Sequence, residues 1–181
     1  MKRKIALVVG STFLCASILS GCASATPVDK YLRSFDKGDS EAASQIYSEE
    51  IKDNAEDKEA LQTKLKERMD SIYENFKSGK ITSDEAKEKL KSYKEYDTSS
   101  VYAFTTINKV TTLQKSKDAY SDAEKAENDG NLADAITNYK SVIEDDPNHE
   151  TAQAKVLQLS ETYTETIKEY ELAPGQQIVV D

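Results

Sequence analysis

The sequence DGNLADAITNYKSVIED, residues 129–145, predicts a turn between two helices and the helix that follows it. Gly130 falls between two periodic segments, and glycine adopts the left-handed backbone of such a turn without a steric cost. Ala135 and Tyr139 are four residues apart, so they lie on one face of the second helix. A small residue lets two antiparallel helices approach closely, and the aromatic ring fills the space beside them. The stretch therefore predicts a tightly packed helical hairpin.

The same pattern occurs 92 residues earlier in the chain. There, KGDSEAASQIYSEEIKD, residues 37–53, aligns with 129–145 without a gap. Five identities define the match: Gly38 with Gly130, Ala43 with Ala135, Tyr47 with Tyr139, Ile51 with Ile143, and Asp53 with Asp145. The segment SGKITSDEAKEKL is a looser third copy, in which Gly79 precedes Ala86 with two extra residues in the turn. An internal repeat of this kind indicates hairpins built to a common plan.

Helical periodicity extends over most of the chain after residue 28, with apolar residues recurring every three or four positions. The composition agrees, because the chain has only three prolines and six glycines and no tryptophan. We therefore expect an all-α protein of antiparallel helical hairpins, some with long helices. The predicted helices span residues 28–37, 40–53, 57–78, 82–96, 99–129, 132–145 and 148–172. Ser99 or Ser100 is expected to cap the fifth of them.

The second copy resembles a tetratricopeptide repeat. The family's small, turn, small, aromatic and proline positions are occupied here by Ala123, Gly130, Ala135, Tyr139 and Pro147. The proline is expected to end the second helix, because it lacks an amide donor. Two residues depart from the pattern: Ala119 replaces a large residue, and Ala55 in the first copy replaces the proline. The resemblance implies a short stacked array of hairpins over residues 29–173 and a role in binding a protein.

The first 22 residues predict export. Three basic residues precede an apolar run over residues 5–19, and small residues follow it, which is the order of a secretory signal. Leu19, Ser20, Gly21 and Cys22 then resemble the lipobox of bacterial lipoproteins. The resemblance implies that residues 1–21 are a removed signal peptide, that Cys22 carries lipid, and that residues 22–28 tether the protein to the extracytoplasmic face of the membrane. An ordinary signal peptide with a chance cysteine is the alternative.

Several function classes find no support in the sequence. The formal net charge is −9, which argues against a nucleic-acid partner. The carboxylates around the single histidine, in EDDPNHE at residues 144–150, fit an ordinary turn better than a metal site. HETAQ lacks the second histidine of a zinc protease, because Gln153 occupies its position. We therefore expect no cofactor, no metal and no catalysis.

Ten tyrosines lie in the helical region. We expect Tyr47, Tyr139, Tyr163 and Tyr170 to be core or half-core residues that follow the helical period. Tyr93, Tyr96 and Tyr102 follow the period less closely, so they are better candidates for a contact surface.

The chain closes with residues 174–181, where Pro174 and Gly175 break the helical pattern. This segment is expected to be a short extended tail, which either packs on the last helix or is the first strand of a missing region. The main functional hypothesis is a lipid-anchored module that binds an unidentified protein at the cell envelope. The alternatives are a helical spacer and the N-terminal part of a larger envelope protein. A small-ligand-binding transporter lipoprotein is disfavoured, because strands do not alternate with helices.

Overall fold

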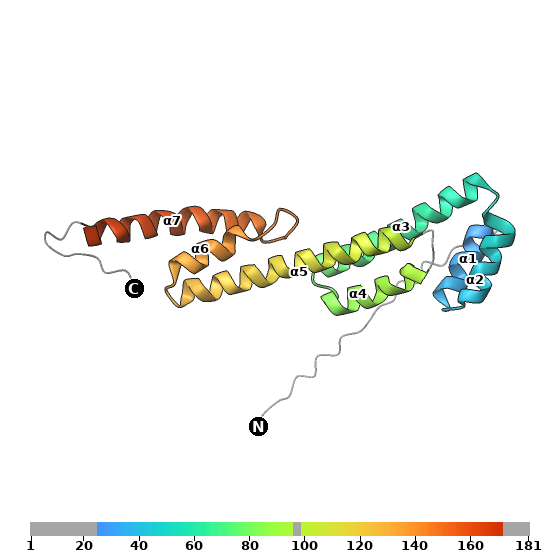
Figure 1. Cartoon of the computed structure of the whole chain (residues 1–181), viewed down its shortest axis with the longest axis horizontal. Coiled ribbons are helices and arrows are strands. Elements are labelled where there is room, and N and C mark those ends of the chain that lie inside the picture. Colours follow the sequence, from blue (N-terminus) through green and yellow to red (C-terminus); the bar gives the residue numbers. More distant parts are fainter. Residues whose placement is uncertain (1–24, 96–98, 172–181) are drawn as a thin grey trace, which may run out of the picture. The chain divides into compact units, whose positions relative to one another are not determined.

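The computed structural model of the chain describes residues 25–95 and 99–171, with side chains over 25–94 and 99–164. Over these ranges the chain is all-α and contains no strand, so the predicted fold class is confirmed. Figure 1 gives the order of the helices α1 to α7. Several residues of the predictions lie outside the described residues: the predicted signal peptide 1–21, the predicted lipidation site Cys22, Tyr96 and the tail 174–181. The side chain of Tyr170 lies outside them too.

The chain divides into two compact units, and the first is Met1–Asn54. Its described part contains α1 (Pro27–Asp36), α2 (Ser40–Ile46) and a π-helical turn over Tyr47–Ile51. Its buried apolar residues are Val28, Tyr31, Leu32, Ala43 and Ile51. The ring of Tyr31 stacks on Phe35 and meets Tyr47 edge to face, with ring centres 6.4 and 6.5 Å away. An aromatic cluster therefore closes this hairpin.

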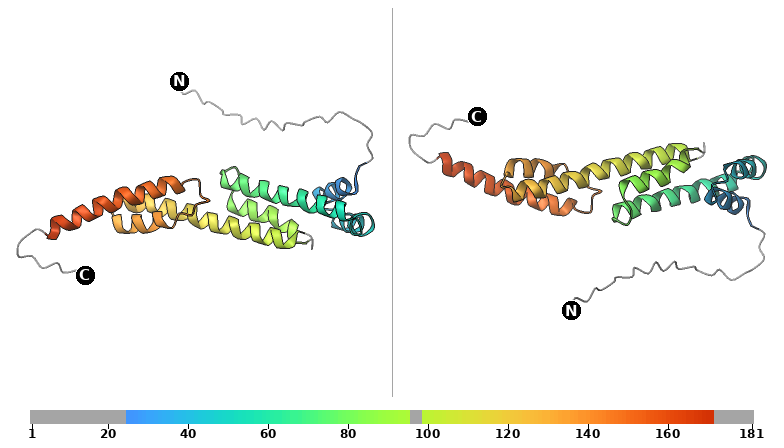
Figure 2. Two further views of the ribbon diagram at one scale, coloured as in Figure 1. Left: turned by 90° about the horizontal axis from the view of Figure 1, so that it is seen from above. Right: turned by 90° about the horizontal axis from the view of Figure 1, so that it is seen from below.

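The second unit is Ala55–Asp181. It contains α3 (Ala55–Lys77), α4 (Ser83–Lys91), a 3₁₀ turn (Ser92–Glu95), α5 (Ser100–Asn128), α6 (Leu132–Lys140) and α7 (His149–Glu171). Within this unit α3 and α4 pack along the first half of α5, α6 packs along its second half, and α7 packs on α6 (Figure 2). Helix α5 has 29 residues and is therefore about 43 Å long. Helix α5 therefore belongs to both halves of this unit: the first half contains α3, α4 and the start of α5, and the second half contains the end of α5, α6 and α7.

Three turns join α1 to α2, α3 to α4, and α5 to α6, and they have the same geometry. Gly38, Gly79 and Gly130 adopt φ values of 72°, 75° and 77°. In the third turn the Gly130 amide donates to Glu127 O at 3.1 Å, and the Asn131 amide donates to Ala126 O at 2.8 Å. Equivalent pairs of bonds close the other two turns, so each first helix ends in a left-handed cap.

The second helix of each hairpin also starts in the same way. A polar side chain caps it by accepting from the amide three residues later: Asp39, Thr82 and Asn131. Four residues after each cap stands a fully buried alanine: Ala43, Ala86 and Ala135. The looser third copy therefore follows the same plan, with its two extra residues in the turn. The stacking of these hairpins into a tetratricopeptide-like array stays a prediction.

The predicted end of α6 is wrong. The sequence predicts a helix over 132–145, whereas α6 ends at Lys140. Its continuation fails because the Ile143 amide donates to Ser116 Oγ at 3.0 Å instead of to a carbonyl of its own helix. Pro147 consequently lies exposed in the loop before α7, so the expectation that it ends the second helix is also wrong.

The tyrosines and the cap of α5 depart from expectation in part. Tyr93 is buried, which removes it from the candidate contact surface, and Tyr163 is 41% exposed instead of half-core. Tyr102 is half-buried and donates to Asp70 at 2.5 Å. Burial and then this hydrogen bond raise the pKa of Tyr102 to about 12. Ser99 is the N-cap of α5, but its hydroxyl donates to Tyr93 O at 2.7 Å and caps no amide.

Candidate functional site

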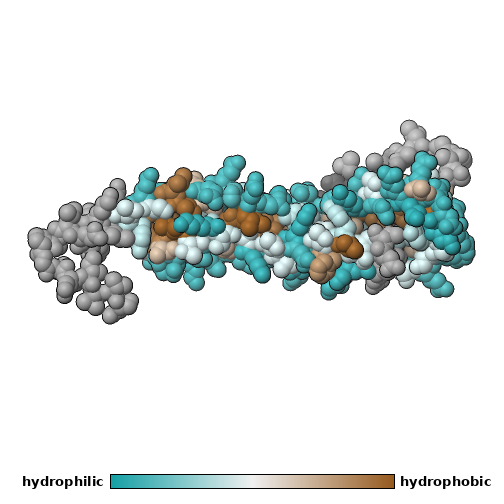
Figure 3. All heavy atoms as spheres, turned by 45° about the horizontal axis from the view of Figure 1, so that its top comes forward, coloured by the Kyte–Doolittle hydropathy of each residue, from teal (hydrophilic) through white to brown (hydrophobic). Residues whose placement is uncertain are grey.

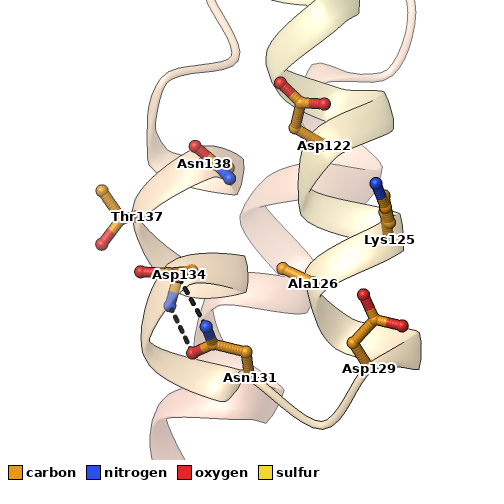
Figure 4. Close-up of a pocket in the computed structure, with 8 residues that line it drawn as sticks. All are labelled: Asp122, Lys125, Ala126, Asp129, Asn131, Asp134, Thr137 and Asn138. Carbon is orange, nitrogen blue, oxygen red and sulfur yellow. Dashed lines mark hydrogen bonds between the residues drawn. The ribbon is translucent and has the colours of Figure 1, made fainter.

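A groove lies between α5 and α6 at their hairpin end, and its volume is about 300 Å³. Both helices and the turn between them supply its walls, as Figure 4 shows. The lining residues are Asp122, Lys125, Ala126, Asp129, Asn131, Asp134, Thr137 and Asn138. All but Ala126 and Lys125 carry oxygen atoms that can accept a hydrogen bond in their side chains. The groove is therefore rich in acceptors.

The same local rules that form the hairpin place these side chains. Asp122 and Lys125 on α5 and Asp129, the residue that follows its end, recur every three or four residues, so they share one face. Asn131 caps α6: its Oδ1 accepts from the Asp134 amide at 3.4 Å, and its Nδ2 donates to the Asp134 carboxylate at 2.5 Å (Figure 4). The cap therefore fixes the side chains of Asn131 and Asp134 on the α6 side of the groove.

The groove has an excess of negative charge. Three carboxylates, of Asp122, Asp129 and Asp134, face a single ammonium, that of Lys125. Within the described residues the side chains of Asp122, Lys125 and Asp129 form no hydrogen bond and no ion pair. They can therefore bind a donor-rich or cationic group without first breaking a contact inside the protein. In the same part of the chain, no group of three His, Cys, Asp or Glu side chains is placed to hold a metal ion.

An apolar core behind the groove holds α6 in place. It is formed by α5, α6 and α7 together with the loop before α7, and its buried members are Ala123, Ala135, Ile136, Tyr139, Val142, Ala152 and Leu159. Tyr139 and Tyr120 meet edge to face with ring centres 5.6 Å apart. Because Ala123 and Ala135 carry only methyl groups, the two helices of the hairpin approach closely.

A polar network joins the same three helices at the edge of this core. Glu127 accepts from Lys155 Nζ at 2.6 Å and from the Tyr139 hydroxyl at 2.8 Å. Both bonds lower the pKa of Glu127 below its ordinary value, and the bond from Lys155 has the larger effect. Burial raises the pKa of Tyr139, and the hydrogen bond to Glu127 raises it further. The network therefore keeps Glu127 ionised and Tyr139 protonated at neutral pH.

Exposed apolar residues form a second candidate surface at the start of α5. Val101 and Phe104 are 78% and 56% exposed and lie one turn apart on the same helix face. The ammonium of Lys94 lies 5.9 Å from the centre of the Phe104 ring. Figure 3 shows apolar surface over the region of α6 and α7 as well, where Leu157 is 69% exposed.

Leu157 is informative because Leu65 lies 92 residues before it, at the same offset as the internal repeat. Leu65 is fully buried in α3, and its neighbours Leu61 and Met69 are buried too. The residues of α7 that correspond to these neighbours are polar and exposed, namely Gln153 and Glu161. The face of α7 that carries Leu157 is therefore mostly polar. We rank it below the groove as a binding surface.

The residues that the repeat singled out build the hairpins, and none of them lines the groove. Gly130, Ala135 and Tyr139 form the turn and the buried face of α6, whereas Pro147 lies in the following loop. Gly38 and Ala43 have the equivalent places in the first unit, where Tyr47 is half-buried. On α6 the groove residues Asp134, Thr137 and Asn138 alternate with the buried positions Ala135 and Tyr139, whereas the other groove residues lie on α5 and in the turn. Their one signal in the sequence is the dense run of Asp and Asn around Gly130.

No protein-family model, curated protein or solved structure matches the chain. In the described part of the chain, every helix is too short or too polar to cross a membrane.

Proposed function

We propose that this chain is an exported lipoprotein, held at the extracytoplasmic face of the membrane by lipid on Cys22, whose helical hairpins bind a protein partner without catalysis. The order of basic, apolar and small residues before Cys22 supports the anchor. The three hairpins of one plan support the binding role, because repeated hairpins commonly serve as extended binding surfaces.

The observation that carries the binding role is the open groove between α5 and α6. Its carboxylates at Asp122 and Asp129 have no partner inside the described part of the chain. A partner segment with lysine, arginine or backbone amide donors would satisfy these acceptors. The apolar core behind α6 keeps the groove in shape before a partner arrives, which lowers the entropic cost of binding.

A photo-crosslinking experiment in the host tests this proposal. A crosslinking amino acid at Thr137, which lines the groove, should give a discrete product with one partner. The same amino acid at Glu161, exposed on α7, is the matched control and should not. Adding Asp122→Lys with Asp129→Lys should abolish the product while the helical content stays unchanged. A folded protein that gives no product at Thr137, or gives the same product at both positions, would contradict the binding role.

The anchor is tested separately by mass spectrometry of the purified chain. We expect the mature protein to begin at Cys22 and to carry acyl chains, each contributing about 0.8 kcal/mol per buried methylene to membrane binding. Cys22→Ala should yield an uncleaved or released protein. Normal processing and membrane retention of this variant would refute the anchor and leave the groove hypothesis untouched.

A helical spacer is the second candidate function, and the length of α5 favours it. This single helix spans about 43 Å and carries buried residues from Ala103 to Ala123. A spacer would tolerate Asp122→Lys with Asp129→Lys but lose function with Leu113→Pro, because proline breaks a helix in its interior. The binding module would lose function with both changes, so the pair of variants separates the two.

A further inference from the structure

The loop between α6 and α7, residues 141–148, is held in place by α5. Asp146 in this loop is only 3% exposed. Its carboxylate accepts from Ser116 Oγ at 2.7 Å and from the Asn148 amide at 2.9 Å. Ser116 Oγ in turn accepts from the Ile143 amide at 3.0 Å. A buried carboxylate is costly unless it is hydrogen-bonded, so these bonds determine where the loop lies.

Asp145, the residue before Asp146 in the loop, is held by side chains of α3. The Asp145 carboxylate accepts from the Tyr73 hydroxyl and pairs with the Lys77 ammonium. Burial raises the pKa of Asp145, but the hydrogen bonds from Lys77 and Tyr73 outweigh it, so the pKa lies below its ordinary value. The same contact raises the pKa of Lys77. Both partners are therefore charged at neutral pH.

Helix α5 also holds the end of α3 directly. The Lys117 ammonium donates to Phe76 O at 3.3 Å and to Lys77 O at 3.0 Å, which are carbonyls at the C-terminus of α3. It also lies 4.9 Å from the centre of the Phe76 ring. A cation at the C-terminus of a helix is favourable because of the helix dipole. The loop 141–148, the end of α3 and the middle of α5 thus meet at one polar junction.

The two halves of the second unit have separate apolar contacts on either side of this junction. The core of Ala123, Ala135, Tyr139, Ala152 and their neighbours belongs to the second half of α5, to α6, to Val142 and to α7. Among the described helices, α3 and α4 pack along α5 but not along α6 or α7. Apart from α5 itself, the halves are therefore joined chiefly through polar side chains.

We propose that this junction is a conformational lock that couples the two halves of the second unit and whose opening releases the loop, α6 and α7 while α3 and α4 stay folded. We define the lock by its side chains: Tyr73, Lys77, Ser116, Lys117, Asp145 and Asp146. Polar contacts suit a reversible lock, because water can satisfy these groups when it opens. The groove lies in the half of the unit that contains the loop, α6 and α7.

Hydrogen exchange of the full chain in detergent tests the lock. Ser116→Ala removes a partner of buried Asp146 and of the Ile143 amide. We expect amides of α6 and α7 to exchange about 10- to 100-fold faster, because an unsatisfied buried polar group strongly favours the open state. Amides of α3 and α4 should change by less than about threefold. The control is Thr106→Val, since within the described residues the buried Thr106 hydroxyl donates only to Tyr102 O of its own helix.

A second variant covers the case in which Ser116→Ala does not fold. Asp145→Asn removes the charge that pairs with Lys77, and this pair is partly exposed, so the variant should fold. It should accelerate exchange in α6 and α7 about 3- to 10-fold, and added salt should shrink that difference by screening the pair in the unchanged protein. Faster exchange spread evenly over α3 to α7 would overturn the proposal, because the unit would then open as one body. Unchanged exchange in both variants would overturn it equally.

Discussion

Replacing Ala135 by leucine should destabilise the α5–α6 hairpin. The alanine is fully buried, and fully buried Ala123 and Tyr139 belong to the same core, so the added isopropyl group has no free volume. Overpacking of this kind costs about 1 to 3 kcal/mol. With an m-value of about 2 kcal/mol per molar urea, the midpoint of unfolding should fall by about 0.5 to 1.5 M. Circular dichroism in a urea titration measures it.

Ala133→Leu is the matched control for this prediction. Ala133 lies on the same helix, only two residues away, but its side chain is exposed. The same change in helix propensity therefore occurs without any change in packing, and the midpoint should move by no more than the equivalent of about 0.5 kcal/mol. Equal shifts for both variants, or a neutral Ala135→Leu, would refute the argument that this alanine sets the distance between the two helices.

Other predictions concern the turn, the polar networks and the exposed surface. Gly130→Ala should lower the free energy of unfolding by about 1 to 2 kcal/mol in the same titration, because alanine is strained at a φ of 77°. The new methyl group would meet no other atom, so an unchanged midpoint would refute this backbone strain. Tyr139→Phe should lower the free energy of unfolding by about 1 kcal/mol in the same titration, because it removes the 2.8 Å bond to Glu127; an unchanged midpoint would refute this contribution. The pKa values of Glu127 and Asp145 are lowered in the fold, so their contribution is present above the ordinary carboxyl pKa and is lost as the pH falls through the folded-state values. Titrations below about pH 5 should therefore show falling stability, and Glu127→Gln should make the fall shallower; an identical slope would contradict the assignment. Phe104→Ser should change stability by less than about 0.5 kcal/mol, because the ring is 56% exposed, and a larger loss would mean that the ring is part of a core.

The candidate site illustrates the limit of sequence reasoning for this protein. The repeat pattern located the hairpin, since Gly130 and Ala135 carry signals that act over a few residues. It did not locate the groove, because Asp122, Asp129 and Asn138 are ordinary polar residues on a helix surface until two helices bring them together. Nor did it predict a buried Asp146, because an aspartate in a turn is usually solvated.

The sequence by itself determined the all-α class, the order of the helices and the three turns at Gly38, Gly79 and Gly130. These features depend on backbone conformation and on hydrogen bonds between residues close in the chain, so their signals are local. Tertiary structure alone decided the end of α6, because the amide of Ile143 finds its acceptor in Ser116, 27 residues away on another helix. It likewise decided which helix faces stay open and which carboxylates are buried. Such outcomes depend on which residues pack against each other in space. The periodicity of a sequence shows which face of a helix is buried but does not identify the residue that covers it.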